Sequence, residues 1–225
     1  MPLPLLAVIA LIAAGIGGTI ALAAALWPNA KGKTVLLLGS NLVGKTTLAE
    51  FLAKGTIPES YVRTAGTKYL DHKGDIRVGD LSLTVDRVVD VPGEELGIRA
   101  WFDNARQADL IVYLLDHSAA HDPAAAKRVR RDCSQLADWR KRDELKKEAR
   151  ALVLVTHLDD DDRWREGIPR SEYNSAYEVA QATPAATAAR SALGPDVHLI
   201  ASTLATEKGR YDAVFRVLES SGWAR

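Results

Sequence analysis

The feature that most constrains the fold is a glycine-rich turn between two segments of different periodicity. Residues 34–39, "TVLLLG", form a short continuous apolar run, which is typical of a strand buried on both faces of a parallel sheet. Residues 46–55 after the turn have helical spacing and end at a glycine. A strand, a glycine-rich turn and a helix in this order predict an α/β protein with a mostly parallel sheet.

The turn itself predicts a phosphate site, because two glycines, a lysine and a hydroxyl residue have the phosphate-binding spacing. Glycines let successive backbone amides point at phosphate oxygens, and the start of the helix adds partial positive charge. We expect Lys45 to reach the outer phosphates and the Thr46 hydroxyl to bind Mg²⁺. The candidate nucleotide-binding residues here are Gly39, Ser40, Asn41, Leu42, Val43, Gly44, Lys45, Thr46 and Thr47.

The rest of the chain continues the alternation of strands and helices. A mostly parallel sheet with helices on both faces is therefore the predicted architecture. "IRVGDLSLTV" is the exception and predicts a hairpin that turns at Gly79 and Asp80. The predicted strands are residues 81–91, 108–116, 151–159 and 196–203, and the predicted helices are residues 123–150, 171–193 and 207–220.

Three of these strands end in residues that suit a guanine nucleotide. Asp90 and Gly93 follow "VV", where the carboxylate can hold Mg²⁺ through water and the Gly93 amide can contact a terminal phosphate. In "THLD", Asp159 can accept hydrogen bonds from the N1–H and exocyclic amine of guanine, which adenine does not offer. At the end of "IAST", amides near Ser202 and Thr203 can face the guanine O6. GTP or GDP with Mg²⁺ is the expected ligand.

These elements, in this order, resemble the Ras-like small GTPase superfamily of P-loop GTPases from Thr34 to the C-terminus. The resemblance is closest to Arf-like proteins and to the membrane-anchored β subunit of the signal recognition particle receptor. It implies a switch threonine that joins the metal, for which Thr64 in "TAG" is favoured over Thr67. It also implies GTP hydrolysis, with Lys45, Thr64, Gly93 and Glu94 as the catalytic set.

The sequence departs from the family pattern at two places. Thr156-His157-Leu158-Asp159 replaces Asn-Lys-x-Asp, so the threonine takes over part of the asparagine's hydrogen bonding and His157 covers the purine face. Glu94 stands where many relatives carry a water-orienting glutamine. A carboxylate beside the terminal phosphate is electrostatically unhelpful, so we expect slow intrinsic hydrolysis and an activating partner. Arg63 and Arg99 are alternatives for a charge-stabilising residue within the chain, although loop arginines are more often only solvated.

The N-terminus has the composition of a membrane anchor. Residues 2–30 carry no charged side chain, and the apolar run 3–27 would span roughly 37 Å as a helix, against about 30 Å for a hydrocarbon core. A signal peptide is the main alternative, but it needs a basic stretch before a shorter apolar core. We expect a transmembrane helix within residues 1–30, contacting lipid through residues 3–27. A GTPase domain, residues 31–225, would follow on the cytoplasmic side behind Lys31 and Lys33. A small-residue stripe in this helix would allow dimerisation, although an alanine-rich chain also produces such stripes by accident.

Lys plus Arg and Asp plus Glu both total 29, so the net charge is zero and gives no reason to expect nucleic-acid binding. We expect a membrane-anchored switch whose GTP form recruits a protein effector. Two alternatives remain: a receptor or scaffold subunit that holds GTP as a structural ligand, and a P-loop protein that uses ATP. Trp101 follows the Asp90–Gly93 motif, on the predicted second switch, and either faces a partner or packs beneath the switch.

Overall fold

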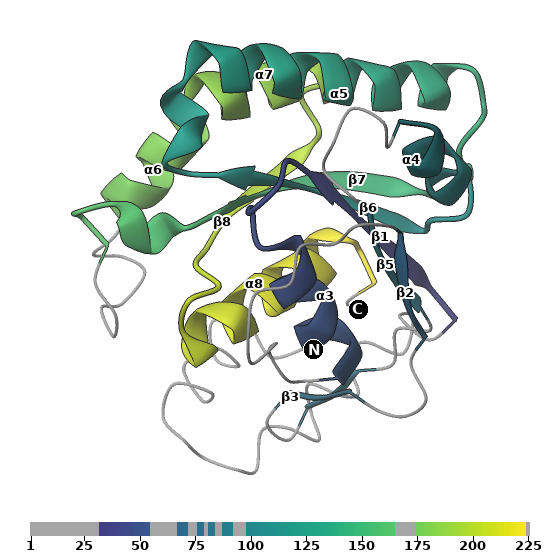
Figure 1. The fold of residues 1–225 in the computed structure, drawn as a ribbon, viewed down its shortest axis with the longest axis horizontal. Helices are drawn as coiled ribbons and strands as arrows, with labels where there is room; N and C mark the ends of the chain where they lie inside the picture. The colour runs from purple at the N-terminus through teal and green to yellow at the C-terminus, as the bar shows by residue number, and fades with distance from the viewer. Residues whose placement is uncertain are drawn as a thin grey trace, which may run out of the picture.

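The computed structural model describes residues 32–54, 67–71, 76–78, 81–83, 87–91, 98–164 and 174–223. The chain alternates between strands and helices, and its strands form a six-stranded sheet in the order β2-β5-β1-β6-β7-β8 (Figure 1). Adjacent strands run parallel except at the β2 edge, where β2 is antiparallel to β5. The predicted mixed α/β architecture with a mostly parallel sheet is therefore confirmed. The strands are β1 (Thr34–Gly39), β2 (Lys68–Asp71), β5 (Arg87–Asp90), β6 (Leu110–Asp116), β7 (Arg150–Thr156) and β8 (His198–Ala201).

Helices cover both faces of the sheet (Figure 1). On one face lie α3 (Lys45–Lys54) and α8 (Glu207–Ser220), and on the other lie α4 (Ile98–Ala105), α5 (Pro123–Lys141) and α7 (Pro184–Leu193). A shorter helix, α6 (Asn174–Ala182), precedes α7.

Two cores, one on each face, explain why the first strand is continuously apolar. Val35 and Leu37 belong to the core beneath α3 and α8, whereas Leu36 and Leu38 belong to the core beneath α4, α5 and α7. All four side chains are fully buried. Successive side chains of a strand point to opposite faces, so a strand covered on both sides needs an apolar residue at every position.

Two predicted helices are wrong in extent. The helix predicted over 123–150 ends at Lys141, and Asp143 in the following turn has a φ of 56°. The helix predicted over 171–193 is two helices, because Thr183 is extended before Pro184 and its hydroxyl caps the second one by accepting from Ala186 N at 3.3 Å. A residue before proline is disfavoured in the helical region. The helix predicted over 207–220 is confirmed as α8.

Several predicted strands are too long. The run 81–91 holds two strands, β4 (Leu81–Leu83) and β5, and β4 pairs antiparallel with β3 (Ile76–Val78) as the predicted hairpin requires. Gly79 and Asp80 at its turn lie outside the described residues. The run 151–159 stops as a strand at Thr156, where His157 turns left-handed with a φ of 55° into the short 3-10 helix η4 (Leu158–Asp160). β6 and β8 are likewise shorter than predicted, and β2 and α4 were not predicted.

The predicted transmembrane helix, residues 1–30, lies outside the described residues. Within the part of the chain that the structure describes, no helix has both the length and the apolar character needed to span a bilayer.

Candidate functional site

The candidate site lies where the parallel strands end. The turn after β1, the carboxylate of Asp90 at the end of β5, and the segments after β7 and β8 all lie at the carboxyl edge of the sheet. Open α/β sheets bind their ligands at this edge. The predicted phosphate-binding residues, 39–47 with Asp90, therefore lie at the same edge of the sheet as the predicted base-binding residues, 156–159 and 202–203. We call these two groups the phosphate half and the base half of the candidate site.

The turn after β1 needs glycine at its two glycine positions. Gly39 has a φ of 134°, and a Cβ there would lie 2.4 Å from the carbonyl oxygen of Leu114 on β6. Gly44 has a φ of 84°, and its Cβ would lie 2.7 Å from the Leu204 side chain beyond β8. Leu42 between them is left-handed as well, with a φ of 65°, and 65% of it is exposed. The turn thus packs its backbone directly on β6 and on the chain after β8.

Lys45 is a buried cation folded into this turn. Only 6% of the residue is exposed, and Nζ donates to the carbonyl oxygens of Gly39 at 3.1 Å and Ser40 at 2.5 Å. Burial lowers the Lys45 pKa from 10.5 to about 8, although the negative charge of Asp90 acts in the opposite direction. The ammonium group therefore remains mostly protonated at neutral pH, at the place where the turn would hold phosphate.

Two of the three predicted metal ligands, Thr46 and Asp90, are in direct contact, and the third, Thr64, lies outside the described residues. The Thr46 hydroxyl donates to Asp90 Oδ2 at 2.7 Å, and Asp90 is completely buried. A hydroxyl and a carboxylate oxygen are hard donors of the kind that Mg²⁺ prefers, and Mg²⁺ usually takes only one or two protein ligands beside phosphate and water. The described residues contain no cluster of three or more His, Cys, Asp or Glu that would hold a metal alone. This donor set therefore fits Mg²⁺ bound together with a nucleotide.

Thr156 connects the base half of the site to the phosphate half. Its side chain is completely buried, with Oγ1 3.0 Å from the Val43 carbonyl oxygen and 2.9 Å from that of Leu115. The single hydroxyl proton serves one of these two carbonyls at a time. His157 is half-buried, with Nδ1 3.7 Å from Asp116 Oδ1. Thr156 therefore links the end of β7 to the turn after β1 and to the end of β6.

Asp159 and Thr203, which the sequence assigned to different atoms of a guanine base, contact each other. The Thr203 hydroxyl donates to Asp159 Oδ1 and accepts from the backbone N–H of Ala205 at 3.1 Å. The Ser202 N–H donates to the Val155 carbonyl at 2.9 Å, and the Ser202 hydroxyl contacts Gly209 O and Asp212. The amide of Ser202 is therefore hydrogen-bonded to β7 and its hydroxyl to α8. Thr203 instead fixes the orientation of the Asp159 carboxylate.

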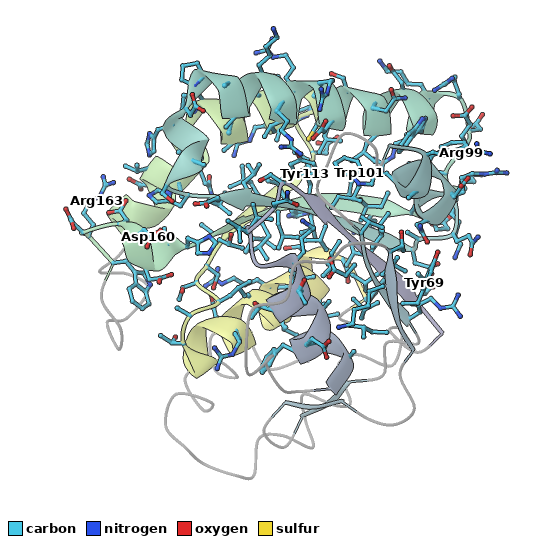
Figure 2. The ribbon with its side chains drawn as sticks, viewed as in Figure 1. Tyr69, Arg99, Trp101, Tyr113, Asp160 and Arg163 are labelled. Atoms are coloured by element: carbon cyan, nitrogen blue, oxygen red, sulfur yellow. The ribbon has the colours of Figure 1, made fainter. Side chains whose placement is uncertain are left out.

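A polar cluster that the sequence did not single out supports the turn after β7. His117 is only 5% exposed, and its Nε2 lies 3.1 Å from Asp161 Oδ2. Asp161 also accepts two hydrogen bonds from the Arg163 side chain, which lower its pKa to about 2. Figure 2 shows Arg163 and Asp160 together on this turn. The acidic run 159–162 is the only sequence signal of this cluster.

The remaining predicted residues are distributed as follows. Thr47 is half-buried in the first turn of α3, and Thr67 is half-buried directly before β2. Arg99 is exposed on the outer side of α4, away from the sheet (Figure 2). Trp101 is buried, and its ring lies edge-on to Tyr113 at 6.3 Å, so of the two alternatives the structure favours packing. Thr64, Gly93, Glu94 and Arg63 lie outside the described residues.

Comparisons of the sequence with the models of known protein families and with curated proteins find no match. The functional assignment therefore depends on the geometry of the site and on the motif resemblance.

Proposed function

We propose that this chain is a membrane-anchored GTP-binding protein that hydrolyses GTP slowly and acts as a nucleotide-dependent switch for a protein partner. The single observation that carries the proposal is the contact between Thr46 and Asp90 beside the buried Lys45. Cation, hydroxyl and carboxylate come from the turn after β1 and from the end of β5, which is the set that Mg²⁺-nucleotide phosphates require.

At the phosphate half, the turn would surround the phosphate oxygens with backbone N–H groups, and the first turn of α3 would add its partial positive charge. Lys45 would exchange its contacts with Gly39 and Ser40 for the outer phosphates. Mg²⁺, held by Thr46 and Asp90, would neutralise charge on the phosphate oxygens. The switch threonine, Thr64 in preference to Thr67, and Gly93 would contact the terminal phosphate in the GTP form.

At the base half, Asp159 is the residue that would select guanine. Thr203 occupies one lone pair of one carboxylate oxygen, and a carboxylate has about four acceptor sites. The carboxylate can therefore keep this contact and accept from guanine N1–H and its amine. Adenine has no matching donors at that edge, so its binding would leave the carboxylate without these bonds.

Two parts of the proposal come from the sequence alone. The apolar residues 3–27 would anchor the chain in a membrane, with the domain on the cytoplasmic side. Glu94 in place of glutamine would make hydrolysis slow, so that turnover depends on an activating partner. Glu94 equally favours a second candidate, a receptor or scaffold subunit that retains GTP as a structural ligand with little turnover.

The experiment that tests this proposal uses the full-length chain purified in detergent micelles. Binding of GTP, GDP and ATP is measured by calorimetry with Mg²⁺ and with a chelator, and release of phosphate is followed in a single turnover. We expect Mg²⁺-dependent binding of GTP in preference to ATP, with hydrolysis over minutes to hours. Retention of GTP without measurable hydrolysis would favour the scaffold candidate, and equal binding of ATP and GTP would contradict the proposal.

A further inference from the structure

We propose that residues 140–150, which lead from the end of α5 into β7, lie against the anionic phospholipid headgroups of the membrane that holds the chain. We call these residues the basic segment. The candidate site, at the opposite edge of the sheet, would then face away from the bilayer. This inference rests on the membrane anchor of the proposed function and is independent of which nucleotide the site binds.

The basic segment is rich in exposed cations. It contains six basic and three acidic residues, so its net charge is +3 although the whole chain is neutral. The neighbouring segments at the same edge of the sheet, 32–34, 106–109 and 194–198, add two basic and two acidic residues and leave this excess unchanged. Lys141 and Lys147 form no ion pair with any described residue. All six basic residues are exposed: Arg140, Lys141, Arg142, Lys146, Lys147 and Arg150.

The carboxyl edge of the sheet has the opposite charge. The segments 116–122 and 157–163, which follow β6 and β7, contain six aspartates and one arginine, and the turn after β1 adds Lys45. β6 has seven residues, so the two edges lie about 20 Å apart. The described part of the domain is therefore electrically polarised, and an anionic surface attracts the amino edge and repels the carboxyl edge.

Contacts of Asp109 fix the basic segment beside the start of β1. The Asp109 carboxylate accepts hydrogen bonds from the Thr34 N–H at 2.9 Å and from Lys146 Nζ at 3.0 Å. Lys33 Nζ lies 3.7 Å from the other oxygen of the same carboxylate. The Asp109 carbonyl also accepts from the Arg150 N–H at 3.0 Å. The start of the first strand and the basic segment are thus held together.

The length of the preceding chain places this edge near the bilayer. The apolar run that would span the membrane ends at Trp27, and Lys33, six residues later, already lies beside Asp109. Six residues reach at most about 21 Å when fully extended. The anchor therefore keeps the basic segment within reach of the headgroups.

Such a tether alone leaves the domain free to rotate, so the charge difference between the two edges decides the orientation. Exposed lysine and arginine side chains near a bilayer are attracted by anionic lipids, and this attraction falls off within a Debye length. Zwitterionic lipids have no net charge and do not supply it. The expected ligand is therefore the headgroup of an anionic phospholipid such as phosphatidylserine.

Two labelled positions measure the orientation. Gln107, before β6, is exposed at the amino edge, and Ala124, in the first turn of α5, is exposed at the carboxyl edge. Each is changed to cysteine in the full-length chain, labelled with a donor fluorophore and placed in lipid nanodiscs whose headgroups carry an acceptor dye. The native Cys133 is fully buried, and burial raises the pKa of its thiol, so it does not compete for the label.

The measured quantity is the ratio of energy transfer at the amino-edge position to that at the carboxyl-edge position. We expect phosphatidylserine in a phosphatidylcholine disc to raise this ratio by at least about twofold, and salt of about 1 M to abolish the rise. Lys141→Gln combined with Lys147→Gln should lose most of the rise. Lys127→Gln combined with Arg130→Gln removes the same charge from exposed positions in the first half of α5 and should retain it.

A wild-type ratio that phosphatidylserine does not change, or a rise that both double variants lose equally, would overturn this inference and leave the anchor and the nucleotide site intact. Failure of the wild-type chain to enter the nanodiscs would overturn the anchor and this inference together. Absence of GTP binding by chains that enter the nanodiscs and show the rise would overturn the nucleotide part of the proposed function alone.

Discussion

The phosphate half and the base half of the site are built in different ways. The phosphate half comes from residues 39–47 and the carboxylate of Asp90, and its shape depends on glycine backbone and on a buried lysine. The base half is assembled from the segments after β7 and β8, which side-chain hydroxyls connect to each other and to the phosphate turn. The phosphate half is therefore mostly one continuous stretch of sequence, joined to Asp90, whereas the base half is assembled through tertiary contacts of Thr156 and Thr203.

The comparison predicts that changes at the phosphate half affect all nucleotides equally. Lys45→Ala removes the buried cation, so we expect affinity for GTP and for GDP to fall by about 100-fold, with the preference for GTP over ATP unchanged. Calorimetry with the three nucleotides measures both quantities. Lys141→Ala, at an exposed position, is the matched control. A loss of base preference in Lys45→Ala would mean that the two halves are not separate.

Asp90→Asn tests how much Mg²⁺ contributes to binding, apart from the other parts of the phosphate half. The amide keeps the shape of the carboxylate beside Thr46 but loses its charge, so Mg²⁺ should no longer strengthen binding. We expect GTP affinity in Mg²⁺ to fall by about tenfold, to the value that the wild type shows with a chelator. An undiminished effect of Mg²⁺ in this variant would place the metal elsewhere.

The pKa of Lys45 gives a pH test of the same half. Since burial lowers this pKa to about 8, the lysine of the free protein loses its proton as the pH rises past that value. GTP affinity should then fall by about tenfold for each pH unit, and Lys45→Ala should show no such fall. In the window from about 8 to 10.5 the unfolded chain binds more protons than the folded one, so the contribution of Lys45 makes folding more favourable with rising pH. A GTP affinity that stays constant across pH 8 would contradict the buried-cation account.

The smallest effect is expected at Thr203, which supports Asp159 in the base half. Thr203→Val keeps the volume of the side chain but removes the hydroxyl that orients Asp159. We expect the preference for GTP over ATP to fall by about fivefold, with the ratio of GTP to GDP affinity unchanged. Thr187→Val at an exposed position of α7 is the control. A change in the ratio of GTP to GDP affinity instead would show that Thr203 acts on the phosphates.

The sequence predicted best what depends on local pattern. β1, α3 and the turn between them follow from the apolar run, the glycines and the lysine. Asp90 was assigned to the same metal as Thr46 from its place at a strand end, and the two residues are in contact. The helix break at Pro184 was signalled by the proline, but the helical spacing on either side concealed it. The contacts of Thr156 with Val43 and of Thr203 with Asp159 join residues 113 and 44 positions apart. Periodicity and motif spacing carry no information about such contacts.

The central claim is that Asp159 reads the edge of guanine, and exchange of its carboxylate tests this most directly. Binding of GTP, ATP and xanthosine triphosphate, each with Mg²⁺, is measured by calorimetry for the full-length wild type and for Asp159→Asn. The account predicts that the wild type prefers GTP over ATP by at least about 100-fold and that the asparagine variant prefers xanthosine triphosphate. Equal affinity of the wild type for GTP and ATP, with no change of preference in the variant, would contradict it.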